Sequence, residues 1–237
     1  MKPNTLIAST AALLLAGLAS SAFGEIKVTV ERNDNEHATP RFKFANIPAP
    51  AANDAAASAK FTVVSGDRDE NGADVDALND GKLPSKEDEP ERNFFFDAGT
   101  DGGRLKVDFG KVMQITQINT YSWHPNTRGP QIYKLYASDG AAEGFDTKPK
   151  RGTDPAAHGW KLIANVNTEP KSGEPGGQYG VSISDSDGAL GKYRYLLFDI
   201  ACTENEDDYG NTFYSEIDVI ANEPAAPGMA TTTHSER

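Results

Sequence analysis

The stretch GRLKVDFGKVMQITQINTYSW, residues 103–123, decides the fold, because apolar side chains alternate along it in two successive runs. In the first run Leu105, Val107 and Phe109 share one face, and the second run covers 115–123. A period of two residues is typical of a half-buried β-strand and not of a helix. The stretch therefore predicts two strands.

Segments of the same kind lie on both sides of this stretch. They are 25–32, 60–64, 131–138, 160–166, 179–184, 193–201 and 213–220, with 41–46 as a further candidate. Clusters of Gly, Pro, Asn and Asp separate them, and no window of a dozen residues has a helical apolar period. Several short strands at this spacing predict an all-β sandwich or barrel.

The composition narrows the classes of partner. The 237 residues contain 23 Lys and Arg against 35 Asp and Glu, a net charge of -12. Such a surface repels the phosphates of nucleic acids and of anionic membranes, and it suits Ca²⁺. Cys202 is the one cysteine, which excludes an intrachain disulfide framework and a cysteine-based zinc cluster. We expect its thiol to be buried and inert.

The ends of the chain differ in character from its middle. Residues 1–24 have Lys2, an uncharged apolar run and the small-residue pattern Ala22-Phe23-Gly24, which predict a cleaved secretory signal peptide. We therefore expect a secreted, periplasmic or cell-surface protein with no membrane insertion. The expected division is a signal peptide at 1–24, an N-terminal extension at 25–58, the sandwich at 59–221 and a disordered tail at 222–237. Within the extension, 48–59 is either a short Ala-rich helix capped by Asn53 or Asp54, or a packed linker.

One loop combines aromatic and basic side chains. TYSWHPNTRGPQ (120–131) begins in a predicted strand and breaks at Pro125, so that Trp123, His124 and Arg128 lie near the strand end. Aromatic faces stack on sugar rings, while His and Arg donate hydrogen bonds to hydroxyls. Alternatively, Trp123 packs in the core and Arg128 bonds loop carbonyls. We expect His124 and Arg128 to be exposed, because they follow the strand break.

Acidic loops offer candidate cation ligands. In DRDENGADVDALND (67–80), Asp67, Asp69, Asn71 and Gly72 fit half of a calcium loop. The twelfth position is Leu78, where an EF-hand needs a bidentate Glu, so that an ordinary turn and calcium ligation both remain possible readings. Asp80 could ligate calcium or cap the Asp-Gly turn.

Catalytic motifs are missing from the sequence. There is no G-x-S-x-G elbow, and none of the four His residues has zinc-protease spacing with another. Carboxylates are plentiful, so a glycosidase pair remains a third reading beside a binding module and an interaction protein. The sequence favours a protein without catalytic activity.

The order of several motifs resembles one family. NDGKLP (79–84), VDFG (107–110), YKLYASDG (133–140) followed by Trp160, YRYLLF (193–198) and Glu216 are similar to the discoidin, or coagulation factor 5/8 C-terminal, domains. The likeness covers about 59–221. The insert 141–158, the extension 25–58 and the lack of the terminal disulfide of the animal members depart from the family pattern.

The resemblance implies a fold, two sites and a function. It implies a galactose-binding-like jelly-roll sandwich, with a structural Ca²⁺ held by Asp80, Glu216 and nearby carbonyls. It also implies a ligand site at one end of the sandwich, formed by Trp123, His124, Arg128, Tyr209 and Asn211. The expected function is that of a secreted, non-catalytic carbohydrate-binding module whose partner is a polysaccharide or glycan. The alternative is a cell-envelope module that interacts with a partner protein or has a structural role.

Overall fold

The computed structural model describes residues 24–204 and 210–222. The predicted signal peptide up to Phe23, the loop residue Tyr209 and the tail from Glu223 lie outside the described residues. Within the described part, no helix is long and apolar enough to cross a membrane.

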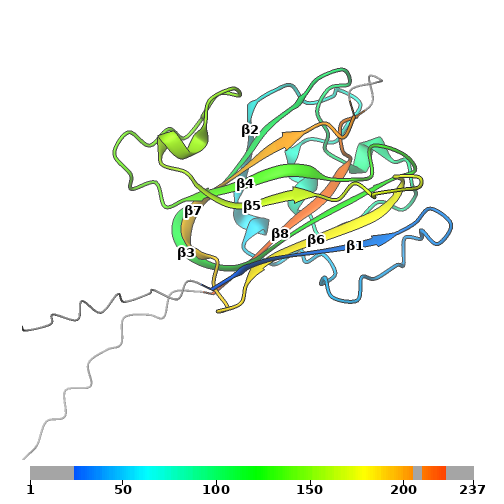
Figure 1. The fold of residues 1–237 in the computed structure, drawn as a ribbon, viewed down its shortest axis with the longest axis horizontal. Coiled ribbons are helices and arrows are strands. Elements are labelled where there is room, and N and C mark those ends of the chain that lie inside the picture. Colours follow the sequence, from blue (N-terminus) through cyan, green and yellow to red (C-terminus); the bar gives the residue numbers. More distant parts are fainter. Residues whose placement is uncertain (1–23, 205–209, 223–237) are drawn as a thin grey trace, which may run out of the picture.

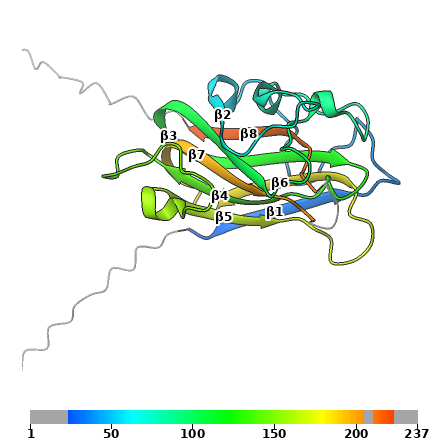
Figure 2. The same cartoon turned by 90° about the horizontal axis from the view of Figure 1, so that it is seen from above.

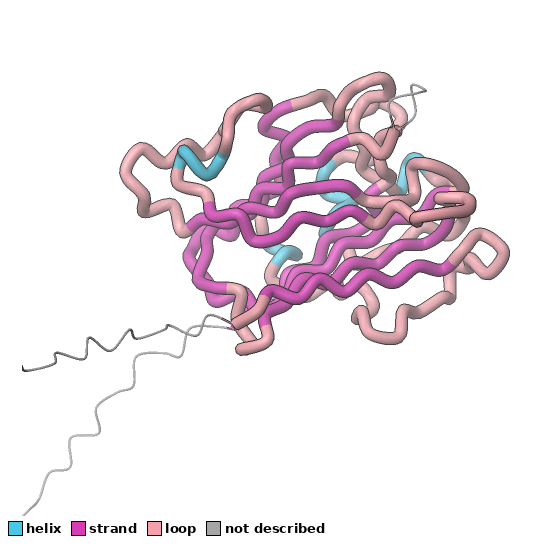
Figure 3. The backbone as a smooth tube through the Cα atoms, in the orientation of Figure 1, coloured by secondary structure: helices cyan, strands magenta, loops and turns pink. Residues whose placement is uncertain are grey.

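The alternating segments form strands, and each strand pair is antiparallel (Figure 1). The strands are β1 (Ile26–Asn33), β2 (Lys60–Ser65), β3 (Gly102–His124), β4 (Ile132–Ser138), β5 (Lys161–Asn167), β6 (Gly177–Asp185), β7 (Gly191–Ala201) and β8 (Tyr214–Asn222). The short 3-10 helices are η1 (Ala56–Ser58), η2 (Val75–Asn79), η3 (Pro90–Arg92) and η4 (Pro155–His158). Figure 3 shows that strands form the body of the molecule and that these helices lie in its connections.

Strand β3 is the longest of the described strands and pairs with four others. Its first half pairs with β2 and β7, and its second half pairs with β6 and β8. The ladder with β7 is interrupted between Asp108 and Met113, where Gly110 has a φ of 73°. Because glycine adopts a positive φ without strain, the chain can change direction here. The two strands predicted from 103–110 and 115–123 are therefore one bent strand.

The core lies between the two sets of strands, β1-β6-β3-β8 and β2-β3-β7-β4-β5 (Figure 2). Inward side chains from both sets form one buried cluster, which includes Leu105, Val107, Ile118, Leu135, Val181, Ile183, Leu196, Phe198, Ile217 and Val219. Full burial of one such side chain contributes about 1.5–3 kcal/mol. The prediction of an all-β sandwich is confirmed.

The N-terminal extension departs from two expectations. The candidate strand at 41–46 is wrong, because these residues form turns and bends with no sheet partner. The Ala-rich segment forms only the single-turn helix η1, where Asp54 Oδ1 accepts a hydrogen bond from the backbone N–H of Ala57 at 3.1 Å. The first part of the extension is β1, which pairs with β6, and the chain between β1 and η1 is irregular. There Tyr121 on β3 donates a hydrogen bond to the carbonyl of Pro48 at 2.6 Å.

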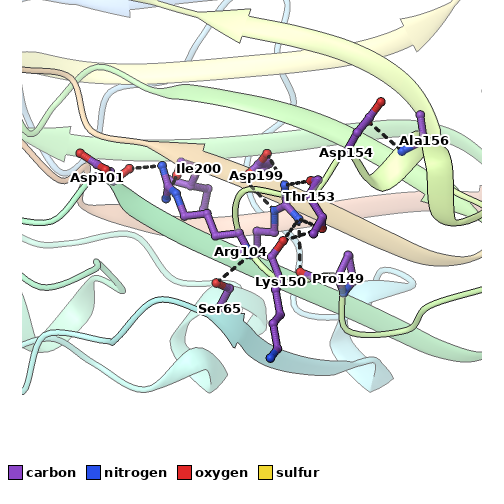
Figure 4. Close-up of polar contacts among 11 residues, drawn as sticks. Ser65, Asp101, Arg104, Pro149, Lys150, Thr153, Asp154, Ala156, Asp199 and Ile200 are labelled. Carbon is purple, nitrogen blue, oxygen red and sulfur yellow. Dashed lines mark hydrogen bonds and ion pairs between the residues drawn. The ribbon is translucent and has the colours of Figure 1, made fainter.

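The insert 141–158 is held to the sandwich by a buried cation (Figure 4). Arg104 on β3 is 3% exposed, and its Nε lies 3.0 Å from Oδ1 of Asp199 on β7. The same guanidinium donates to the carbonyls of Lys150 and Thr153 at 2.7 and 2.8 Å. A planar guanidinium can bond a carboxylate and several carbonyls at once, so Arg104 fixes the insert against the outer face of the sheet.

Candidate functional site

An open pocket of about 500 Å³ lies where β3 ends. His124 is the last residue of β3, Arg128 follows the break at Pro125, and Phe213 precedes β8. The loop before β3 adds Phe95, and the loops after β2 and η2 add acidic and amide groups. The lining side chains include Asp69, Asn71, Asp88, Phe95, His124, Asn126, Arg128 and Phe213. The pocket therefore joins segments that are far apart in the sequence.

Two phenylalanines hold the guanidinium of Arg128 in place. The rings of Phe95 and Phe213 stack at 4.1 Å with an angle of 12° between their planes. The Arg128 Cζ lies 4.6 Å from the centroid of Phe95 and 4.3 Å from that of Phe213. Its Nε donates to the carbonyl of Asn211 at 3.2 Å. Cation–π contact and this hydrogen bond keep the charge of Arg128 at the pocket wall.

His124 is buried rather than exposed, which corrects the expectation from its place after the strand. It is 5% exposed. Its ring packs against Phe213 in a T-shaped arrangement, with the two ring centroids 4.6 Å apart. Burial, together with the nearby Arg128 charge, lowers the pKa of His124 to about 4. Its Nδ1 accepts a hydrogen bond from the backbone N–H of Asn126 at 3.3 Å, which places the proton of the neutral ring on Nε2. Nε2 lies 3.9 Å from Asp88 Oδ1, so this N–H is a donor on the side of the pocket where Asp88 lies.

The side chains of Trp123 and Asn211 do not line this pocket, and Tyr209 lies outside the described residues. Trp123 is 5% exposed and lines a separate cavity beside Phe42 and Phe44, since neighbouring residues of a strand point to opposite faces. Asn211 is buried, and its Nδ2 donates to the carbonyls of Asp97 and Thr100 at 2.6 and 3.1 Å, which shapes the loop before β3. Of the five predicted ligand residues, the structure brings His124 and Arg128 together.

Sequence reasoning missed the aromatic pair and the acids of this pocket. Phe95 belongs to the run NFFF (93–96), and its neighbours Phe94 and Phe96 pack together inside the core at 5.2 Å. Alternation across that run was the available signal that Phe95 faces the other way. No local pattern of the sequence places Asp69 or Asp88 beside Arg128, so neither acid could be assigned to this pocket from the sequence.

The half calcium loop at 67–72 is organised by its own side chains. Asp69 Oδ1 accepts hydrogen bonds from the backbone N–H and the Nδ2 of Asn71, both at 2.9 Å. Arg68 Nη1 donates to the carbonyls of Asp69 and Gly72 at 2.7 and 2.6 Å. Because a guanidinium already bonds two of the loop carbonyls, the structure favours the reading as an ordinary turn.

A second group of carboxylates lies inside the protein, under the Asp80-Gly81 turn. Glu216 on β8 is fully buried, and the backbone N–H of Gly81 donates to its Oε2 at 3.0 Å. Its Oε1 has no hydrogen-bond partner within the described residues. Burial, with the adjacent charge of Asp218, raises the pKa of Glu216 to about 9. Burial likewise raises the pKa of Asp218 to about 7. The Asp80 carboxylate lies nearer the surface, 3.0 Å from the amine of Lys82.

The oxygen atoms under this turn match part of the ligand set of the implied calcium ion. An oxygen that is buried, acidic and without a partner fits a hard cation that takes oxygen ligands. Within 24–204 and 210–222, no three His, Cys, Asp or Glu side chains are grouped as a metal site. Backbone carbonyls would thus have to supply most of the six to eight oxygens that Ca²⁺ takes.

The comparisons with known proteins find similar structures but no similar sequence. No protein-family model and no curated protein matches the chain. One similar solved structure is the family 32 carbohydrate-binding module of NanJ from Clostridium perfringens in complex with galactose. It has 13% identity and a TM-score of 0.40, with 68% of this chain and 90% of that chain covered.

Of two further similar structures, one is covered almost completely by this chain and the other only in part. Chitosan-binding module 1, derived from a chitosanase/glucanase of a Paenibacillus species, has 12% identity and a TM-score of 0.43, covering 70% of this chain and 97% of that chain. SpGH29 has 12% identity and a TM-score of 0.44, covering 74% of this chain, which spans 29% of the SpGH29 chain. At these values the likeness assigns neither a family nor a ligand, and the function is argued from the pocket itself.

Proposed function

We propose that this protein is an exported, non-catalytic module that binds a glycan in the pocket between His124 and Arg128. Export is proposed from the signal-peptide pattern at 1–24. The observation that carries glycan binding is the rigid guanidinium of Arg128, stacked beside Phe95 and Phe213. A fixed donor next to acceptor carboxylates suits a ligand whose hydroxyls both donate and accept hydrogen bonds.

The division of donors and acceptors in the pocket supports a polyol ligand. Arg128 and the His124 Nε2–H donate, while the carboxylates of Asp69 and Asp88 accept. Adjacent hydroxyls of a pyranose can bridge such groups in pairs, while the buried rings of Phe95 and Phe213 keep the Arg128 guanidinium in position. An open pocket of about 500 Å³ has room for one or two sugar units.

Binding without cleavage is proposed from the setting of the two acids. A glycosidase acid keeps its proton because it lies in an apolar, buried environment. Asp88 is exposed, and Asp69 is half-exposed with one oxygen committed to Asn71. Neither position has the enclosure that a general acid needs. We expect no new reducing ends when the protein is incubated with a galactan that it binds.

A structural calcium ion is part of the proposal. Glu216 Oε1 and an oxygen of Asp80 would hold it, together with carbonyls of the Asp80-Gly81 turn. Bound there, the ion would neutralise the buried carboxylate and tie the turn to β8. Its role would be to stabilise the fold, because it binds the folded state and not the unfolded one.

The test of glycan binding uses two matched arginine variants of the mature chain. Arg128→Ala should lower affinity in affinity electrophoresis against a galactan series at least tenfold, the usual cost of removing a charged hydrogen-bond donor. Arg194→Ala is the control, since Arg194 also stacks on a ring, that of Tyr195 at 4.8 Å, but does not line the pocket. Equal affinity of both variants and the parent, or no binding to any glycan screened, would rule out the proposed site.

A further inference from the structure

A second cleft of about 230 Å³ lies between the N-terminal extension and the turn that follows η2. Phe42 and Phe44 form its aromatic wall, with ring centroids 5.1 Å apart and planes at 88°. Phe44 also packs against Tyr121 on β3, at 6.4 Å, and against the bare backbone of Gly180 on β6. The prolines 48 and 50 and Leu83 complete the apolar lining.

The irregular segment that follows β1 is fixed in this shape by side chains of the strands. The carboxylate of Glu31 on β1 accepts hydrogen bonds from the backbone N–H groups of Ala45 and Asn46 at 2.7 and 3.0 Å. On the other side of the cleft, Tyr121 donates to the carbonyl of Pro48. A loop held at both ends has less conformational entropy to lose when a ligand binds. The cleft is therefore pre-formed.

The charge at this cleft is opposite to that of the whole protein. Its lining contains Arg41 and Lys43 and no acidic residue, although the chain carries a net charge of -12. Both side chains are exposed, and in the described parts of the chain neither forms an ion pair. Two cations beside an aromatic wall are complementary to a ligand with an apolar face and an anionic group.

A small cavity that shares residues with the cleft is lined by Trp123, whose indole N–H has no acceptor within the described residues. The cavity has a volume of about 20 Å³ and shares Phe42, Phe44 and Leu83 with the cleft. The indole Nε1 of Trp123 is buried. A buried N–H without an acceptor is costly, and a cavity of this size admits one water-sized oxygen. An oxygen of a bound ligand, or a water beneath it, would satisfy this donor.

We propose that this cleft is a second ligand site, which binds an anionic sugar unit of a polysaccharide through its carboxylate or sulfate group. The C–H face of the sugar packs on Phe42 and Phe44, and the anion pairs with Arg41 and Lys43. The site is separate from the pocket of His124 and Arg128, so it neither requires nor excludes ligand binding there. The residues of the extension that line the cleft would thus have a role in ligand binding.

The experiment measures binding of the mature chain to three defined polymers. The probes are alginate, a polyuronate; carrageenan, a sulfated galactan; and an uncharged galactan. The double variant Arg41→Gln/Lys43→Gln should lose about tenfold affinity for the anionic polymers, since two exposed charge contacts contribute about 1.4 kcal/mol together. Lys134→Gln/Lys192→Gln, which removes two exposed charges from β4 and β7, should retain full affinity. Phe42→Ala should weaken binding as well, and higher salt should weaken it in the parent.

The outcomes separate this site from its alternatives. Loss with alginate alone, or with carrageenan alone, identifies carboxylate or sulfate as the recognised group and supports the site. No binding to either anionic polymer overturns it, and so does an equal loss in the two double variants, which would reveal unspecific charge attraction. Loss of alginate binding in Arg128→Ala would move the ligand to the first pocket and also overturn it, because alginate has no neutral unit for that pocket. Equal binding of a single-stranded DNA oligonucleotide would overturn the assignment to sugars.

Discussion

Replacing Glu216 by Gln should remove a pH dependence that the buried carboxyl imposes on folding. The pKa of Glu216 rises from an ordinary value of 4.5 to about 9 in the folded protein, mainly through burial. An acid whose folded pKa is raised contributes its full stability below pH 4.5 and loses that contribution as the pH rises through the folded value. Over that range the free energy of unfolding falls by about 1.4 kcal/mol for each pH unit.

The effect of Glu216 is best measured at the upper end of this pH range, because the neighbouring Asp218 titrates in the lower part. Burial raises the pKa of Asp218 from 3.8 to about 7, so its contribution to the slope has ended above that pH. Between pH 7 and 9 the parent should lose about 2 kcal/mol more than Glu216→Gln does, once the curvature near the folded pKa is included. Gln keeps the shape of the side chain and the acceptor for the N–H of Gly81.

Urea denaturation in the presence of chelator, at several pH values from 5 to 9, measures this difference. Glu143→Gln on the exposed insert is the surface control and should follow the parent. Adding Ca²⁺ should then raise the melting temperature of the parent, and more so at pH 8 than at pH 5, since the ion competes with the proton for the carboxylate. Parallel pH profiles for parent and variant would refute the reasoning, and a melt that ignores Ca²⁺ would refute the proposed ion.

Three further predictions test other parts of the structure. Arg104→Met should lower the free energy of unfolding by on the order of 3 kcal/mol, because the Asp199 carboxylate and the carbonyls of the insert lose their donor. Limited proteolysis should then show earlier cleavage within 141–158. Glycan affinity should stay constant between about pH 5.5 and 8, since the depressed pKa of His124 keeps the ring neutral there; a fall centred near 6.5 would contradict this. Trp123→Phe should leave the affinity for uncharged galactan unchanged, because Trp123 does not line the pocket of His124 and Arg128, and a loss measured by affinity electrophoresis would mean that the two sites are coupled.

Strand positions could be predicted because alternation is a local property. Every segment from 103 onwards that alternates in the sequence became a strand or part of one, within two residues at each end. The segment 41–46 also alternates, yet Phe42 and Phe44 form no ladder. Their side chains pack on each other and on Tyr121, and the backbone of the same loop is held by Glu31. Alternation indicates that every second side chain contacts an apolar surface. Phe42 and Phe44 do so, but the backbone of their segment pairs with no strand.

The pocket was only partly predictable, for a different reason. His124 and Arg128 lie four residues apart around a proline, so the local sequence already placed them together. Phe95 and Phe213 are separated by more than a hundred residues, and only the closing of the sandwich brings their rings to 4.1 Å. Trp123 and His124 are neighbours in β3, so their side chains point to opposite faces of the strand. For this reason His124 lines the pocket and Trp123 does not.

Because neighbouring side chains of β3 point to opposite faces, the end of this strand can contribute to two ligand sites. His124 lines the pocket with the acids Asp69 and Asp88, and Trp123 lines the small cavity that shares residues with the cleft of Arg41 and Lys43. A polysaccharide with alternating neutral and acidic units would offer hydroxyls to the pocket and an anionic group to the cleft. Binding at the two sites would then be linked by the polymer, and avidity would exceed either affinity whenever one chain spans both. A short oligosaccharide that fits one site should lack this gain, so the ratio of polymer to oligosaccharide affinity should collapse when either Arg128 or the Arg41/Lys43 pair is removed.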